Sequence, residues 1–297
     1  MGALSGRVAI VTGAGKGLGR AYALELASQG AAVVVNNRRH AGDDDAQASA
    51  SQTAAAIRAR GGRATANFDA VQSADAGRHM VELALREFGR LDIVVANAAV
   101  PQAAPFHRLG PGEFRGIFDV GFFGTLHLLE AAWPLFREQR YGRIVTTSSS
   151  AGRYGQHGLS AYGAAKAAIE SLSRTLAAEG LRHDIRVNVV SPYAHSQMTE
   201  AHIGGDVAAL FQAERVAPLV AWLASEQCSA NGEVFVAGGG RCRRAYAVET
   251  GSVPMEPGDF GALLRALQET PAVGYAASNA AFDSLVREAG LMPQRAG

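Results

Sequence analysis

The 297-residue chain is short of the features on which several classes of protein depend. Its two cysteines, Cys228 and Cys242, are too few for a disulfide framework and form no convincing metal site. No apolar run approaches the roughly 18–20 residues of a membrane-spanning helix. The stretch from Met1 to Arg7 also lacks the charged-then-apolar order of a secretory signal. A formal net charge of +1 favours neither nucleic acid nor a membrane surface as a partner. We therefore expect a cytoplasmic protein that holds no metal.

Lysine is almost absent from the chain. Of its 28 basic residues, 26 are arginine and two, Lys16 and Lys166, are lysine. Lysine carries a compact charge on an amine whose pKa responds to burial, and arginine does not replace it where that property matters. Both lysines fall inside the motifs described below, which makes chance a less attractive explanation for their positions.

Short apolar runs rich in β-branched residues alternate with longer amphipathic stretches. Nearly continuous apolar strands indicate burial on both faces, as in a parallel sheet covered by helices on each side. The alternation therefore predicts a Rossmann-like α/β fold, a doubly wound parallel sheet with helices on both faces. The expected strands are Val8–Thr12, Ala32–Asn36, Arg63–Phe68, Asp92–Ala96, Arg143–Thr147, Arg186–Val190 and Val234–Ala237, and the expected helices lie near 17–29, 46–60, 73–89, 111–139, 160–181 and 214–224.

The chain is expected to divide near residue 240. Residues 1–240 carry the strand–helix alternation and form the predicted catalytic domain, and residues 241–297 form a C-terminal extension. Within the extension, Gly240–Gly258 loses periodicity and contains three arginines and two prolines, so we interpret it as a linker or lid. Two short helices are predicted beyond it, at Phe260–Glu269 and Ala276–Glu288. We expect this tail to pack on the domain or on a neighbouring subunit.

A glycine-rich segment follows the first predicted strand and opens the first predicted helix. Glycines at such a place let the backbone turn tightly and approach a pyrophosphate, whose charge sits at the helix N-terminus. An ordinary tight turn is the alternative interpretation, but the position between strand and helix is the context that a dinucleotide fingerprint requires. The candidate cofactor-binding residues in this segment are Gly13, Lys16, Gly17, Leu18 and Gly19.

The end of the second predicted strand bears on the choice between NAD and NADP. Asn37 stands where an acidic residue would hydrogen-bond the ribose 2′-hydroxyl of NAD. Arg38 follows it with a planar fork suited to phosphate, and Lys16 supplies a second cation on the same side. The pattern favours NADP(H), with NAD(H) as the alternative cofactor and a solvated basic loop as the alternative interpretation.

Three further residues form a candidate catalytic constellation. Tyr162 and Lys166 lie four residues apart at the start of a predicted helix, so their side chains share one face. Ser149 lies at a predicted strand end, on the carboxyl edge of the sheet where α/β proteins bind ligands. Tyr162 can exchange a proton with a substrate oxygen and Ser149 can hydrogen-bond that oxygen. Because the pKa of a free tyrosine is about 10, Tyr162 needs a nearby cation such as Lys166 to act at neutral pH. A surface pair on a helix is the alternative for Tyr162 and Lys166 taken alone.

Together, the glycine spacing, Ser149 and the Tyr162–Lys166 pair resemble the short-chain dehydrogenase/reductase family over about residues 1–240. The resemblance implies a nicotinamide-dependent oxidoreductase in which Lys166 also holds the nicotinamide ribose. It implies homodimers or homotetramers formed through the helices near 111–139 and 160–181.

The resemblance also assigns roles that spacing alone does not. It implies that Asp69 meets the adenine and that Asn97 supports the sheet and the cofactor. Thr199, with His195 and Ser196 beside it, stands where the family meets the carboxamide and the substrate. Gly121 stands where the family usually has an asparagine that supports a water relay to the lysine. Without that side chain, the relay could run through water alone, or the enzyme could be slow, specialised or inactive.

Within the family, the pattern is similar to the (3R)-hydroxyacyl-CoA dehydrogenase region of multifunctional enzyme type 2 and its bacterial single-domain relatives. Residues 17–24, 141–144, 216–223 and 231–235 carry this similarity. That subfamily normally has an acid where Asn37 stands and uses NAD.

These observations predict an NADP(H)-preferring oxidoreductase that interconverts a ketone and a secondary alcohol. The expected substrate is a mid-sized apolar small molecule such as a 3-oxoacyl thioester, a steroid or a specialised-metabolite ketone. Two alternatives stay open: a non-catalytic dinucleotide-binding regulator, and an enzyme of the same fold that catalyses elimination or cyclisation. Apolar candidates for the substrate pocket are Phe122, Phe123, Tyr154, Tyr193 and Phe211.

Overall fold

The computed structural model describes residues 2–39, 42, 44, 47–194, 209–255 and 259–289. The chain forms two compact units, Met1–Arg244 and Ala245–Gly297, called here the first and second units.

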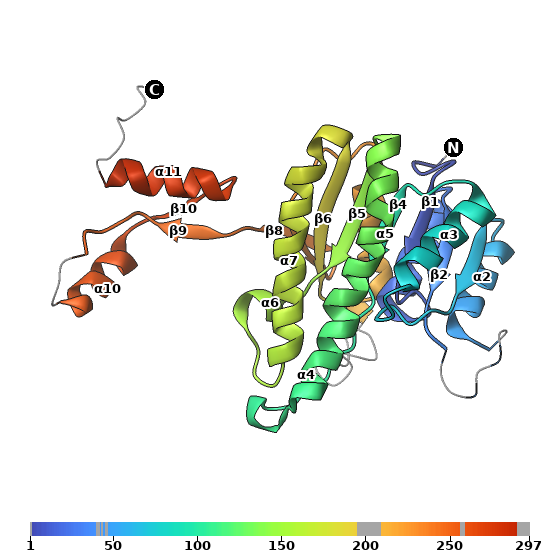
Figure 1. Cartoon of the computed structure of the whole chain (residues 1–297), viewed down its shortest axis with the longest axis horizontal. Helices are drawn as coiled ribbons and strands as arrows, with labels where there is room; N and C mark the ends of the chain where they lie inside the picture. The colour runs from blue at the N-terminus through green and yellow to red at the C-terminus, as the bar shows by residue number, and fades with distance from the viewer. Residues whose placement is uncertain are drawn as a thin grey trace. The chain divides into compact units, whose positions relative to one another are not determined.

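An eight-stranded sheet forms the centre of the first unit (Figure 1). Its strands are β1 (Val8–Val11), β2 (Ala32–Asn36), β3 (Ala64–Asn67), β4 (Ile93–Ala96), β5 (Gly142–Thr147), β6 (Ile185–Pro192), β7 (Val234–Gly238) and β8 (Arg241–Ala245). They are arranged in the order β3-β2-β1-β4-β5-β6-β7-β8, and all neighbours from β3 to β7 are parallel. The chain crosses over between β1 and β4, and the carboxyl ends of strands at such a switch point are where this architecture binds ligands. The predicted doubly wound parallel sheet is confirmed.

Helices cover both faces of this sheet. Val8 and Ile10 of β1 belong to a core with α3, α5 and α7, whereas Ala9 and Val11 belong to a core with α1, α2 and α9. Alternate residues of one strand thus enter opposite cores, which explains why the strands are apolar throughout. The helices are α1 (Gly17–Ser28), α2 (Ser49–Ala59), α3 (Ala76–Phe88), α4 (Pro111–Phe118), α5 (Gly124–Gln139), α6 (Ser150–Tyr154), α7 (Ser160–Gly180) and α9 (Ala217–Leu223), with short 3₁₀ turns at Phe106–Arg108, Leu181–His183 and Ala213–Arg215.

The stretch predicted as one helix over 111–139 is divided. A π-helical turn, Asp119–Phe123, separates α4 from α5. Such a turn inserts a residue into the α-helical register and is frequent at functional sites. Apolar periodicity does not reveal it, because the buried face continues on both sides of the turn.

The segment interpreted as a linker or lid, Gly240–Gly258, contains two strands instead. Gly239 and Gly240 have φ angles of 58° and 71° and lead from β7 into β8, as in the tightest hairpin turns. The side chains of β8 are largely exposed, because the strand forms one edge of the sheet. An exposed edge strand tolerates charged side chains and shows no apolar alternation, which is why the sequence pattern missed it.

The second unit contains two short strands and two helices. Antiparallel pairing joins its strands. The predicted helix at 260–269 has the observed bounds of α10, and the one predicted at 276–288 begins two residues later. The elements are β9 (Val248–Thr250), α10 (Phe260–Glu269), β10 (Ala272–Gly274) and α11 (Ser278–Glu288).

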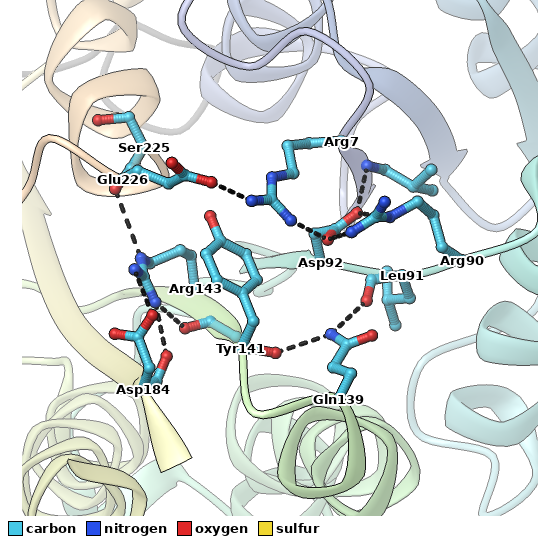
Figure 2. Close-up of polar contacts among 12 residues, drawn as sticks. Arg7, Arg90, Leu91, Asp92, Gln139, Tyr141, Arg143, Asp184, Ser225 and Glu226 are labelled. Carbon is cyan, nitrogen blue, oxygen red and sulfur yellow. Dashed lines mark hydrogen bonds and ion pairs between the residues drawn. The ribbon is translucent and has the colours of Figure 1, made fainter. Parts of the chain in front are cut away.

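A network of ion pairs links the residues at the amino ends of the central strands (Figure 2). The carboxylate of Asp92, which is fully buried, accepts the backbone N–H of Val8 at 2.9 Å and pairs with Arg7 and Arg90 at 2.8 and 2.6 Å. The ring of Tyr141 lies 3.9 Å from the Arg7 guanidinium and 4.3 Å from that of Arg143, which is buried. This network lies at the edge of the sheet opposite the carboxyl ends of its parallel strands.

Candidate active site

The loop between β1 and α1 lines a cavity of about 700 Å3, called here the glycine-loop cavity. Gly13 and Gly17 have φ angles of 64° and 54°, in the left-handed region that favours glycine. A Cβ on Gly19 would lie 2.3 Å from the carbonyl oxygen of Gly13, so glycine is required there as well. The loop thereby presents backbone and the N-terminus of α1 to the cavity, an arrangement that attracts anionic groups.

Asn97, one residue beyond β4, holds this loop from the neighbouring strand. Its Nδ2 donates to the carbonyl oxygen of Thr12 at 3.1 Å, and its backbone N–H donates to Thr12 Oγ1 at 3.0 Å. The N–H of Ala98 donates to the same hydroxyl at 3.1 Å. These bonds tie the carboxyl ends of β1 and β4 together at the switch point of the sheet.

At the end of β2, the neutral Asn37 stands where an acidic residue would bind the ribose of NAD. Asn37 Nδ2 donates to Ser49 Oγ at 3.0 Å, which fixes the amide against the start of α2. The side chains of Arg38 and Lys16 are exposed and line the glycine-loop cavity. Two cations near a neutral amide favour an anionic group at this part of the cavity.

Asp69 lines the cavity from the β3 side, where a set of polar contacts holds its side chain. Asn67 Nδ2 donates to Asp69 Oδ2 at 2.8 Å, and His79 Nδ1 lies 3.5 Å from the same oxygen. Asn36 Nδ2 donates to the backbone carbonyl of Asp69 at 2.9 Å. The carboxylate is thus oriented before any ligand enters.

The structure brings most of the residues predicted to bind a cofactor to this cavity. Nine of them line it: Gly13, Lys16, Gly17, Leu18, Gly19, Asn37, Arg38, Asp69 and Asn97. Thr199, with His195 and Ser196, lies outside the described residues.

Ser149, Tyr162 and Lys166 come together where β5 ends and α7 begins. The Ser149 hydroxyl caps α6 by accepting the N–H of Ala151 at 3.2 Å, and it is also hydrogen-bonded to the Tyr162 hydroxyl. Lys166 Nζ lies 5.7 Å from the centre of the Tyr162 ring, one helical turn away. Because β5 adjoins β4, this Ser149–Tyr162–Lys166 cluster lies at the same edge of the sheet as the glycine-loop cavity.

Burial changes the acidity of both ionisable groups in the cluster. It raises the pKa of Tyr162, and the hydrogen bond with Ser149 acts in the opposite direction. Lys166 is 2% exposed, and burial lowers its pKa from 10.5 to about 8. Its Nζ donates to the carbonyl oxygen of Thr147 at 2.7 Å, which fixes the ammonium near the phenol. An ammonium 5.7 Å from the centre of the Tyr162 ring stabilises a phenolate formed there by proton transfer.

Gly121 lies within the π-helical turn and packs on the helix that carries Tyr162 and Lys166. A Cβ built on Gly121 would lie 3.6 Å from the Cβ of Ala165, an ordinary contact. The position where the family usually has asparagine therefore faces α7 beside Lys166, and the backbone there leaves room for a side chain.

Sequence reasoning missed several residues that line the glycine-loop cavity. Arg20 belongs to the first turns of α1, so the glycine motif itself could have pointed to it. Gln52 comes from α2, and Val71 and Gln72 follow β3; no local pattern marks these three, because only the packing of α2 and β3 beside β1 brings them to the cavity.

The apolar candidates for a substrate pocket lie in different places. Tyr193 and Phe211 both pack against Gly238 at the end of β7, where a Cβ on that glycine would lie 2.8 Å from Tyr193 Cβ and 3.1 Å from Phe211 Cε1. Phe122 and Phe123 belong instead to a row of aromatic rings that runs along α4, the π-helical turn and α5.

Comparison with known proteins identifies the family. The short chain dehydrogenase profile matches residues 7–204. This chain belongs to the short-chain dehydrogenase/reductase family. It is 42% identical over 240 residues to a putative short-chain type dehydrogenase/reductase of Mycobacterium tuberculosis, covering 80% of this chain and 84% of that protein. It is 43% identical over 237 residues to peroxisomal multifunctional enzyme type 2 of Mus musculus, covering 79% of this chain and 32% of the mouse enzyme.

Structural comparison agrees with this assignment. The crystal structure of a short chain dehydrogenase from Mycobacterium avium matches with a TM-score of 0.81 at 33% identity, covering 93% of this chain and 100% of that one. Members of the family are oxidoreductases that use NAD(H) or NADP(H), and this short-chain dehydrogenase/reductase is one of them. Both the family resemblance and the similarity to multifunctional enzyme type 2 are confirmed. In the described part of the chain, none of the helices combines the length and the apolarity needed to span a membrane.

Proposed function

We propose that this short-chain dehydrogenase/reductase prefers NADP(H) and interconverts a ketone and a secondary alcohol on a mid-sized apolar substrate. The observation that carries the proposal is the convergence of a phenol, an ammonium and a hydroxyl in the Ser149–Tyr162–Lys166 cluster. The cluster lies at the sheet edge that also bears the glycine-loop cavity.

The residues of the glycine-loop cavity fit a phosphorylated dinucleotide. Gly13, Gly17 and Gly19 leave the backbone bare where a pyrophosphate would approach the N-terminus of α1. Lys16 and Arg38 would hold the ribose 2′-phosphate. Because residue 37 is asparagine, no carboxylate there would repel this phosphate. Asp69 would meet the adenine, Asn97 would support the loop, and Lys166 would hold the nicotinamide ribose; Thr199, outside the described residues, stays a candidate from the sequence alone. NAD(H) is the alternative cofactor if the two cations do not engage a phosphate.

The cluster has the groups that carbonyl reduction needs. When bound, the cofactor supplies a hydride to the carbonyl carbon or accepts one from the alcohol carbon. As the carbonyl π electrons move to oxygen, Tyr162 Oη releases its proton to that oxygen and becomes a phenolate. The Lys166 ammonium stabilises this phenolate, and Ser149 holds the substrate oxygen by a hydrogen bond. In the oxidative direction the phenolate takes the alcohol proton back.

The substrate class and the assembly belong to the same proposal. The similarity to a 3-oxoacyl-[acyl-carrier-protein] reductase of Synechocystis supports a 3-oxoacyl thioester as one candidate, and a steroid or a specialised-metabolite ketone would also fit. We place the enzyme in the cytoplasm as a homodimer or homotetramer, formed through the helices near 111–139 and 160–181.

Replacing the phenol tests the central assignment. Tyr162→Phe removes the proton donor and keeps the ring, so turnover of a 3-oxoacyl thioester with NADPH should fall by about 10²–10⁴-fold. Binding of NADPH, followed by its fluorescence, should stay unchanged. The control is Tyr141→Phe, which removes a hydroxyl at the opposite edge of the sheet and should alter neither quantity. Turnover retained in Tyr162→Phe would contradict the proposal.

Two further activities remain as second candidates. Gly121 in place of the usual asparagine favours a dinucleotide-binding regulator without catalysis, although the intact cluster argues against it. Binding of NADPH without any change in nicotinamide absorbance over a panel of ketones and alcohols would support the regulator. Product formed in the absence of any nicotinamide would point instead to elimination or cyclisation.

A further inference from the structure

A buried charged cluster lies directly behind Ser149 and plays no part in the proton transfer described above. Glu170 is 3% exposed and lies on α7, one turn beyond Lys166 and two turns beyond Tyr162. The side chain of Arg153, in α6, is also largely buried and forms an ion pair with the Glu170 carboxylate. We call these two residues the Arg153–Glu170 pair.

The pair joins four elements at the carboxyl edge of the sheet. Glu170 Oε1 accepts a hydrogen bond from Ser148 Oγ at 2.8 Å, at the end of β5. Arg153 Nη2 donates to Ser191 Oγ at 2.8 Å, near the end of β6. The other carboxylate oxygen of Glu170 faces Arg174, 3.4 Å away and closer to solvent. The end of β5, α6, α7 and β6 are thus connected through one ion pair.

The backbone contacts of α6 show why such a connection matters for Ser149. α6 has five residues, too few to be stable without tertiary contacts, and Ser149 is its N-cap. A Cβ on Gly152 would lie 2.7 Å from the backbone nitrogen of Ala167, and one on Gly163 would lie 2.8 Å from the Ala151 carbonyl oxygen. The backbones of α6 and α7 therefore touch, and a small displacement of α6 would carry Ser149 away from Tyr162.

A buried ion pair is a poor means of gaining stability, because desolvating both charges costs about as much as their attraction returns. It does impose geometry, since each partner has few positions in which its hydrogen bonds are satisfied. The Arg153–Glu170 pair also lies close to the catalytic hydroxyl, because Glu170 contacts Ser148, the residue that precedes Ser149 in the chain.

We propose that Arg153 and Glu170 are positioning residues: their ion pair holds α6 against α7 so that the Ser149 hydroxyl meets the Tyr162 hydroxyl at the substrate oxygen. The inference rests on the proposed oxidoreductase function and adds to it two residues that touch neither substrate nor cofactor. A misplacement of about 1 Å of a catalytic group is enough to cost about a hundredfold in rate.

A double-mutant cycle tests the proposal. Glu170→Gln keeps the size of the side chain and removes the charge that Arg153 faces, so kcat of the full-length enzyme should fall by about ten- to a hundredfold. The KM for NADPH should stay unchanged. In a Ser149→Ala background the same substitution should change kcat by less than about twofold, because the hydroxyl through which Glu170 acts is gone. Arg153→Met should behave as Glu170→Gln does, and Arg153→Lys should recover part of the lost kcat.

Asp92→Asn is the matched control, since it removes another buried carboxylate of an ion-pair network, at the opposite edge of the sheet. It should lower the melting temperature as Glu170→Gln does and leave kcat unchanged. Equal losses of kcat from Glu170→Gln in the wild-type and Ser149→Ala backgrounds would overturn the proposal, as would wild-type kcat in Glu170→Gln.

A crystal structure of Glu170→Gln gives a readout that does not depend on turnover. The Ser149 and Tyr162 hydroxyls should lie farther apart than in the wild type, and an unchanged separation would overturn the positioning role. Failure of the wild-type enzyme to turn over any ketone or alcohol would count against the proposed function alone.

Discussion

At the scale of single residues, the most informative side chain is a lysine in a protein that otherwise relies on arginine. Lys166 is buried, and burial lowers its pKa from 10.5 to about 8. An arginine would stay charged at any accessible pH and would present its donors in a rigid fork. A lysine places a compact ammonium beside the phenol of Tyr162. The cost of burying that ammonium should be visible in the stability of the protein.

We expect the stability of the wild type to depend on pH in a way that Lys166→Met removes. Between pH about 8 and about 10.5 the unfolded chain holds a proton on Lys166 that the folded protein has lost, so folding becomes more favourable as pH rises. The gain is of the order of 3 kcal/mol over this window and is fully absent below pH about 8. Denaturant unfolding of both proteins across the window measures it. Parallel curves for the two proteins would refute the effect.

We also expect single residues to set the preference between NADPH and NADH. Removing the guanidinium with Arg38→Ala should weaken NADPH binding by about ten- to a hundredfold and leave NADH binding unchanged, because NADH lacks the 2′-phosphate. Asn37→Asp should shift preference toward NADH by adding a carboxylate at the same place. Arg60→Ala, which removes an exposed arginine at the end of α2, is the control. Equal affinities for NADPH and NADH in the wild type and in Arg38→Ala would remove the charge argument.

At the scale of elements, helical glycines have opposite roles that the sequence does not distinguish. Gly121 has room for a Cβ, whereas a Cβ on Gly77 in α3 would lie 2.1 Å from the carbonyl oxygen of His127 in α5. Gly121→Ala should therefore raise the free energy of unfolding by up to about 1 kcal/mol, by restricting the unfolded chain and favouring helix. Gly77→Ala should lower it by about 2 kcal/mol, because α3 and α5 must separate. Denaturant unfolding of both variants compares them, and effects of the same sign would show that this packing argument is wrong.

The strands are secured at their amino ends by Asp92. Asp92→Asn leaves Arg7 and Arg90 without their shared carboxylate, and it should lower the free energy of unfolding by about 3 kcal/mol. Both arginines are partly exposed, which keeps the loss near the lower end of what such a change causes. Urea unfolding measures the loss. A variant as stable as the wild type would mean that the network in Figure 2 contributes no net stability.

At the scale of the whole molecule, the two units differ in how they are built. The first unit has two apolar cores, one on each face of its sheet. In the described part of the second unit no side chain is buried, and Phe260, Leu264, Phe282 and Leu285 are 55–64% exposed. A segment of this length without a core does not fold stably by itself.

A chain shortened to residues 1–247 should therefore fold and bind NADPH. Its unfolding should remain cooperative, because both cores of the first unit are kept. An isolated peptide of residues 245–297 should show no cooperative thermal transition by circular dichroism. Loss of NADPH binding in the shortened chain would show that the second unit supports the cofactor site.

The sequence by itself determined the class of the fold, the seven strands β1 to β7 and the oxidoreductase family. Buried parallel strands are apolar on both faces, glycine is favoured where φ is positive, and a helical turn brings Tyr162 and Lys166 to one side. These are local requirements, and each leaves a pattern in neighbouring residues.

Tertiary structure alone decided which distant residues meet. Three pairs come from separate parts of the chain: Thr12 with Asn97, Arg7 with Asp92, and Arg153 with Glu170. Their contacts exist because β1 packs beside β4, and α6 beside α7. Tertiary structure likewise decided that Arg241–Ala245 forms the strand β8, because this segment pairs with β7 at the sheet edge. A polar or charged residue looks the same in sequence whether it is solvated or paired, since the packed chain around it supplies its partner.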